Sequence, residues 1–131
     1  MDIKKVVKMR KVINVEKCFE KFNDTYSPKI VGDVNSQSVM VVRLEGDKVP
    51  WHIHEKEDEM FFVVDGILDL FEKDNKVTLQ SGEFYIVPKG VEHRVVPQGH
   101  VKLILIEPKD IAHTGNVKSE ITKSSFEILD I

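Results

Sequence analysis

The sequence predicts an all-β domain, built as an antiparallel sandwich or barrel, with one short helix near the N-terminus. From Lys29 onward, short apolar and β-branched runs recur, and turn-forming residues separate them at close, regular spacing. Before Lys29, apolar residues are instead spaced as on one face of a helix. The length of 131 residues suits one domain with a single core and is too short for two ordinary domains.

The N-terminal segment, residues 1–28, is expected to form an arm and one short amphipathic helix. Apolar residues recur at helical spacing between Val15 and Asn23, and Asn14 can accept a hydrogen bond as the N-cap. The preceding stretch mixes basic and apolar residues, so it can be either a strand that pairs elsewhere or a loose arm.

Residues 29–108 are assigned to the barrel, because eight strand-like runs lie within them. Asp65-Gly66 and Asp74-Asn75 are typical of tight hairpin turns, and Pro97-Gln98-Gly99 is typical of a looser one. The expected strands are Lys29–Val34, Ser38–Leu44, Met60–Val64, Ile67–Phe71, Lys76–Leu79, Phe84–Val87, His93–Val96 and Val101–Glu107. The more polar segment 109–131 is expected to pack on the barrel or on a partner chain.

Composition disfavours several classes of protein. The 19 Lys and Arg residues against 22 Asp and Glu give a formal net charge of −3, so no strong basic field favours nucleic acid. The longest apolar runs are far too short to span a membrane, and Met1–Glu20 does not resemble a secretory signal. Cys18 is the single cysteine, which favours a reducing compartment. These features predict a soluble cytoplasmic protein that binds neither nucleic acid nor membrane.

Three histidines and one glutamate form the pattern that carries chemistry. His52 and His54 are two residues apart, so both imidazoles point to one face of an extended strand. Glu59 opens the next apolar run, and His93 opens a later one. Three imidazoles and a carboxylate suit a divalent first-row metal ion. Alternatively, the two strand histidines align without a ligand and His93 lies elsewhere on the surface.

Glycines and a proline surround these residues at fixed spacing. The first segment reads Gly46-x5-His52-x-His54-x4-Glu59-x6-Gly66, and the second reads Gly82-x5-Pro88-x-Gly90-x2-His93. The two segments closely resemble the two motifs of the cupin superfamily. One position departs from the family pattern, because Pro97 stands where the second motif often ends in Asn. That position does not bind the metal in the family.

The resemblance implies a jelly-roll barrel, also called a double-stranded β-helix, with a metal ion inside it. Carried over to this chain, the metal ligands are His52, His54, Glu59 and His93. The resemblance also implies one divalent transition metal per chain, with Mn, Fe, Ni and Zn as the candidates. Glu57 and Asp58 are rival carboxylates, but only Glu59 has the spacing of the motif.

A closer resemblance is to a group of small, uncharacterised, single-domain bacterial cupins. They share the stretch Ser27–Gly32 and the run Val87–Arg94, and they tend to carry a segment like Thr114–Val117. Members of this group lack an assigned reaction. The family resemblance also predicts a homodimer.

Two classes of function fit these observations. The first is a small-molecule metalloenzyme of the oxygenase, isomerase or decarboxylase type, for which Glu57, Tyr85 and Glu92 are the candidate acids or bases. The second is a non-catalytic module that binds or senses a metal or small ligand. Fold alone does not choose between them.

Several other residues are assigned structural or surface positions. Trp51 is out of phase with the two histidines and is expected to face away from them. Arg43 and Arg94 could bind an anionic substrate, although solvent exposure is the simpler expectation for both. His100 and His113 lie in turn-like or polar contexts and are expected at the surface.

Overall fold

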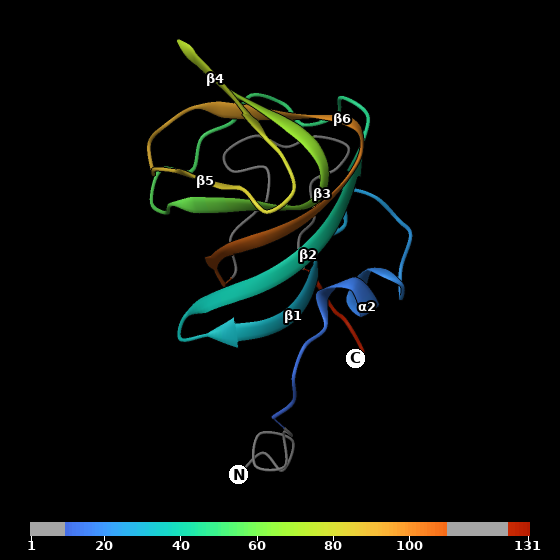
Figure 1. Cartoon of the computed structure of the whole chain (residues 1–131). Helices are drawn as coiled ribbons and strands as arrows, with labels where there is room; N and C mark the ends of the chain where they lie inside the picture. The colour runs from blue at the N-terminus through green and yellow to red at the C-terminus, as the bar shows by residue number, and fades with distance from the viewer. Residues whose placement is uncertain (1–9, 110–125) are drawn as a thin grey trace.

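A computed structural model describes residues 10–109 and 126–131 (Figure 1). In chain order, its elements are α2 (Val15–Phe19), β1 (Lys29–Val34), β2 (Gln37–Glu45), β3 (Glu59–Glu72), β4 (Asn75–Leu79), β5 (Phe84–Val87), β6 (His93–Pro108) and β7 (Glu127–Ile128). The predicted all-β jelly-roll fold with a short helix is confirmed. In the described parts, no helix has the length and apolar character needed to cross a bilayer.

One curved sheet contains the described strands. Its order is β4-β3-β6-β2-β1-β7, and β5 pairs with the first half of β3. The long strands β3 and β6 run antiparallel along almost their whole length, and the sheet curls around a common interior (Figure 1). Side chains alternate between that interior and the outer surface, as on β6, where Val101, Leu103 and Leu105 are buried. The interior therefore forms the main core.

Two of the predicted turns are wrong. Asp65-Gly66 lies inside the continuous strand β3, at a point where the register against β6 shifts. Pro97-Gln98-Gly99 lies inside β6, where Pro97 is opposite Leu68. Glycine and proline mark bulges in strands as well as turns, and only the pairing partner distinguishes the two. Each pair of predicted runs therefore joins into one long strand.

The predicted hairpin near Asp74-Asn75 is present, shifted by one residue. Glu72 pairs with Asn75, which leaves Lys73-Asp74 as the two-residue loop between β3 and β4. A loop of this length is the commonest hairpin connection.

The helix α2 is shorter than predicted and packs on the outer side of the sheet (Figure 1). Asn14 is its N-cap, as predicted, and its side chain accepts a hydrogen bond of 2.9 Å from the backbone N–H of Lys17. Cys18 and Phe19 are buried against Val41 of β2. Cys18 is therefore a buried thiol.

The last described residues pack on the same chain. Glu127 and Ile128 pair in parallel with Lys29 and Ile30 of β1. Lys29 is buried, and its ammonium group lies 3.1 Å from the Glu127 carboxylate and 2.9 Å from that of Asp24. These ion pairs satisfy a charge that would otherwise be costly to bury.

Candidate metal centre

Strand pairing brings the four predicted ligand residues together. Glu59 begins β3 and His93 begins β6, whereas His52 and His54 lie in the segment between β2 and β3. His52 and His93 form an isolated antiparallel bridge, with N–H to O distances of 3.0 and 2.9 Å in the two directions. His54 is held through its carbonyl, which accepts a hydrogen bond of 2.8 Å from the backbone N–H of Gly90. The two sequence motifs thus meet through backbone hydrogen bonds.

The four side chains form a compact buried cluster. One ligand atom from each of His52, His54, Glu59 and His93 lies within 4.8 Å of the others. Glu59 Oε1 lies 3.1 Å from His93 Nε2 and 3.3 Å from His54 Nε2. All four residues are at most 3% exposed. This arrangement supplies three nitrogen donors and one oxygen donor to a single point inside the barrel.

The three imidazole rings are fixed by contacts on their far side. His52 Nδ1 lies 2.8 Å from the Pro50 carbonyl oxygen, and His93 Nδ1 lies 3.0 Å from that of Val91. His54 Nδ1 lies 2.8 Å from the Glu57 carboxylate. Each Nδ1–H can donate to an oxygen acceptor, so the neutral ring presents the lone pair of Nε2 to the cluster. Oxygen acceptors behind each histidine are typical of metal sites.

Charges and burial shift the protonation of these groups. Burial lowers the pKa of His52 to about 4, so this ring is neutral at pH 7. Burial also opposes a charge on His54, but the Glu59 and Glu57 carboxylates outweigh it and raise its pKa. Burial opposes ionisation of Glu59 too, yet the His54 and His93 rings hold the pKa of this carboxyl below its usual range. Glu59 is therefore the negative charge of the cluster.

The donor set fits a divalent transition metal. His54 Nε2 is buried and makes no well-directed hydrogen bond to any of the residues that the structure describes, although Glu59 lies close to it. A buried polar atom without a partner is costly unless an ion or water satisfies it. Imidazole and carboxylate together favour Mn, Fe, Ni or Zn over Ca or Mg. An ion bound by this nitrogen, together with the other three donors, would remove that cost.

Glu107 is a second buried carboxylate that the sequence analysis did not select. Met60 pairs with Ile106 in antiparallel strands, which places Glu107 beside Glu59 on the interior face of β6. It is 1% exposed, and within residues 10–109 and 126–131 neither of its carboxylate oxygens meets the geometry of a hydrogen bond. Burial and the neighbouring charge of Glu59 raise the pKa of Glu107 well above its usual value. The strand alternation, with Leu103 and Leu105 inward, was the signal that could have found it.

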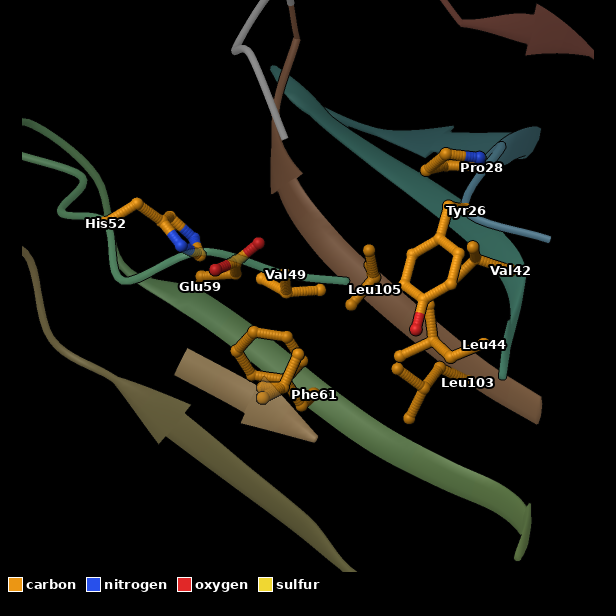
Figure 2. Close-up of a pocket in the computed structure, with 11 residues that line it drawn as sticks. Tyr26, Pro28, Val42, Leu44, Val49, His52, Glu59, Phe61, Leu103 and Leu105 are labelled. Carbon is orange, nitrogen blue, oxygen red and sulfur yellow. The ribbon is translucent and has the colours of Figure 1, made fainter. Parts of the chain in front are cut away.

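A mainly apolar cavity adjoins the cluster (Figure 2). His52 and Glu59 lie at one end, and the ring of Tyr26 lies at the other. The walls between them are aliphatic and aromatic side chains, namely Pro28, Val42, Leu44, Val49, Phe61, Val95, Leu103 and Leu105. The Tyr26 hydroxyl donates to the Gly46 carbonyl oxygen, and burial raises the pKa of Tyr26 to about 12. Tyr26 therefore lines its end of the cavity as a neutral phenol.

None of the candidate acids or bases stands free at the cluster. Glu57 holds His54, as described above. Asp58, which the sequence offered only as a rival to the Glu59 ligand, accepts a hydrogen bond of 2.9 Å from the Lys89 backbone N–H. The Tyr85 hydroxyl donates to Glu72 at 3.1 Å, and Glu92 is exposed. Glu57 thus contacts the metal cluster through His54, whereas Tyr85 is bonded to Glu72 and Glu92 lies at the surface.

The remaining selected residues have structural or surface positions. Trp51 is 41% exposed. Arg43 donates hydrogen bonds to the carbonyl oxygen of Phe19, the last residue of α2, and to that of Phe22, which follows the helix. The Arg43 guanidinium also lies 3.0 Å from a ring nitrogen of His100. Arg94 pairs with Asp47. These contacts assign both arginines to the scaffold, and His113 lies outside the described residues.

Comparison with known proteins adds four findings. A family model described as a cupin domain matches residues 39–107. A cupin-2 domain containing protein from Shewanella frigidimarina NCIMB 400 is 39% identical with a TM-score of 0.72, over 75% of this chain and 95% of that one. Protein NMB1881 from Neisseria meningitidis is 29% identical with a TM-score of 0.68, over 76% of this chain and all of that one. The uncharacterized protein YdbB of Bacillus subtilis (strain 168) is 27% identical over 88 residues, which are 66% of this chain and 76% of that protein.

Proposed function

The chain belongs to the cupin domain family, and from this premise we propose that it is a metal-dependent protein that acts on a small molecule. In this proposal, His52, His54, Glu59 and His93 bind one divalent transition metal ion. The observation that carries the proposal is that four buried residues, His52, His54, Glu59 and His93, each place one ligand atom within 4.8 Å of the others. The adjoining cavity supplies room for the small molecule.

The chain's own residues prepare the site in three ways. The carbonyl groups of Pro50 and Val91 and the Glu57 carboxylate orient the three imidazoles. Glu59 contributes the negative charge, and the apolar wall limits the access of water. A divalent ion held there would supply Lewis acidity toward an oxygen atom of the small molecule, or redox chemistry if it is iron or manganese.

We propose an enzyme of the oxygenase, isomerase or decarboxylase type as the first candidate. The alternative is a non-catalytic module that binds or senses a metal or a small ligand. The specific observation in favour of the alternative is that Glu57 and Tyr85, two of the candidate acids or bases, already have partners. Turnover and binding assays with the metal-loaded protein distinguish these candidates.

Elemental analysis of the purified protein tests the metal site. We expect about one transition metal ion per chain, and we expect the His52→Ala and His93→Ala variants to lose it, because each removes one nitrogen donor. Addition of the same metal to the stripped wild-type protein should raise its melting temperature, since a ligand that binds only the native state stabilises it.

The control variant is His100→Ala, which removes a histidine that pairs with Arg43 and Glu45 outside the cluster. This variant should keep the full metal content. A wild-type protein that stays metal-free after reconstitution at neutral pH would contradict the proposed function.

A further inference from the structure

The residues that line the cavity limit the chemical class of ligand that it can bind. Of the eleven lining residues in the described part of the chain, none is Lys, Arg, Asn, Gln, Ser or Thr. The polar atoms of the lining already have partners or belong to the metal cluster. The Tyr26 hydroxyl donates to Gly46, while His52 and Glu59 belong to the metal cluster.

Such a lining discriminates between classes of small molecule. A sugar buried here would leave its hydroxyl groups without partners, and a sugar phosphate would also bury a charge with no cation opposite it. Both situations are unfavourable, because a buried polar group costs free energy unless it is hydrogen-bonded. An alkyl group in the same place gains from leaving water.

The size of the cavity limits that alkyl group. The volume of the cavity is about 40 Å³, counted as the space open to the centre of a water-sized group. One such group needs about 10–15 Å³ by this measure, so the cavity holds about three of them. A short branched alkyl group of three or four carbon atoms matches this space.

We propose that the ligand of this cavity is a small molecule with a metal-binding polar head and a short branched alkyl tail, rather than a sugar or sugar phosphate. The tail fills the cavity between the metal cluster and Tyr26, and the head faces His52 and Glu59 (Figure 2). This inference rests on the proposed function, because the head is held by the metal ion.

Hydroxamates that share one chelating head and differ in their tails test the proposal. The protein is loaded with Co²⁺, whose visible absorption changes when a ligand binds the ion. We expect isobutyrohydroxamate to bind about tenfold or more tightly than 2,3-dihydroxypropanohydroxamate, a ligand of similar size with a polar tail. Equal affinity of the two ligands, or tighter binding of the polar one, overturns the proposal.

A matched pair of variants tests whether the preference for the alkyl tail arises in this cavity. Val49 lines the cavity and is 8% exposed, whereas Val34 of β1 is 58% exposed and does not line it. Val49→Asn should reduce the preference for the branched alkyl tail several-fold, and Val34→Asn should leave it unchanged. A preference that survives in Val49→Asn as fully as in Val34→Asn contradicts placement of the tail in this cavity.

A measurement that needs no metal tests the apolar cavity separately from the metal site. If Co²⁺ does not bind, the proposed function has failed, and xenon then tests the cavity in the metal-free protein. Xenon binds apolar cavities, so it should shift the methyl NMR signals of Val42 and Leu103 more than those of Val34. Equal shifts at all three residues overturn the apolar-ligand proposal, whatever the metal result.

Discussion

Glu59 and Glu107 are neighbouring carboxyl groups inside an apolar barrel, and their environments push their pKa values apart. The His54 and His93 rings favour the ionised form of Glu59, despite its burial. Glu107 has no such partners, so burial and the charge on Glu59 favour its protonated form. Two like charges side by side in a buried site are not stable together without a cation. In the metal-free protein, these environments therefore favour a carboxylate at Glu59 and a carboxylic acid at Glu107.

The raised pKa of Glu107 has a consequence for stability. Above the pKa of the unfolded chain, the unfolded state releases the proton of Glu107 while the native state still holds it. The contribution of this group to stability is thus complete at low pH and is lost as the pH rises toward the folded pKa. We expect Glu107→Gln to gain stability relative to the metal-free wild type as the pH rises from about 5 toward the folded pKa of Glu107. The gain should be on the order of 1 kcal/mol per pH unit, measured by urea unfolding.

Asp69→Asn is the matched control for this experiment. Asp69 is also buried, but hydrogen bonds from Thr78 and Gln98 outweigh the effect of burial and lower its pKa. Its contribution is already complete above the unfolded pKa, so Asp69→Asn should cost a constant amount from pH 5 to pH 8. A Glu107→Gln difference that is equally constant would contradict the raised pKa.

At the scale of the elements, the two long strands depend on an unusual position in β3. Gly66 has a φ of 99°, and a Cβ atom at this residue would lie 2.6 Å from the backbone oxygen of His100 in β6. That approach is closer than real Cβ contacts allow, and the neighbour is backbone that cannot rotate away. Glycine is therefore required here both by the backbone conformation and by the packing of β3 against β6.

Alanine substitutions at Gly66 and Gly82 separate the effect of the positive φ from the effect of the close approach to β6. Gly66→Ala should destabilise the protein by roughly 2–4 kcal/mol, because strain at positive φ and a backbone clash add together. Gly82→Ala should cost only about 1 kcal/mol, since Gly82 has a φ of 85° but no atom of the described residues lies within 4 Å of the added Cβ. Chemical denaturation of both variants measures the difference. Equal losses of stability would show that the approach to β6 does not matter.

At the scale of the whole molecule, the predicted homodimer concerns the outer surface of the barrel. Among the described strands, β5 pairs only with β3, so its other edge is open. It also exposes Phe84 by 57% and Ile86 by 49%. An open edge with exposed apolar side chains favours association with another chain. We propose that a second copy of this chain covers β5.

Light scattering at micromolar concentration tests this assembly. The wild type should have the mass of a dimer, and Phe84→Lys should have that of a monomer, because the variant puts a charge into the covered surface. Val34→Lys is the control, since Val34 is equally exposed but lies on β1. A monomeric wild type excludes the dimer, and a dimeric Phe84→Lys variant excludes this surface.

The sequence by itself determined the local features of this protein. Alternation of apolar residues located the strands, and fixed spacing identified His52, His54, Glu59 and His93 as one set, because both signals lie within short stretches of chain. Only the tertiary structure decided that Asp65-Gly66 lies at a register shift inside β3 and not in a turn, and that the inward-facing Glu107 is a neighbour of Glu59. Both depend on the register between β3 and β6, which are distant along the chain, and register is set by pairing across the whole sheet.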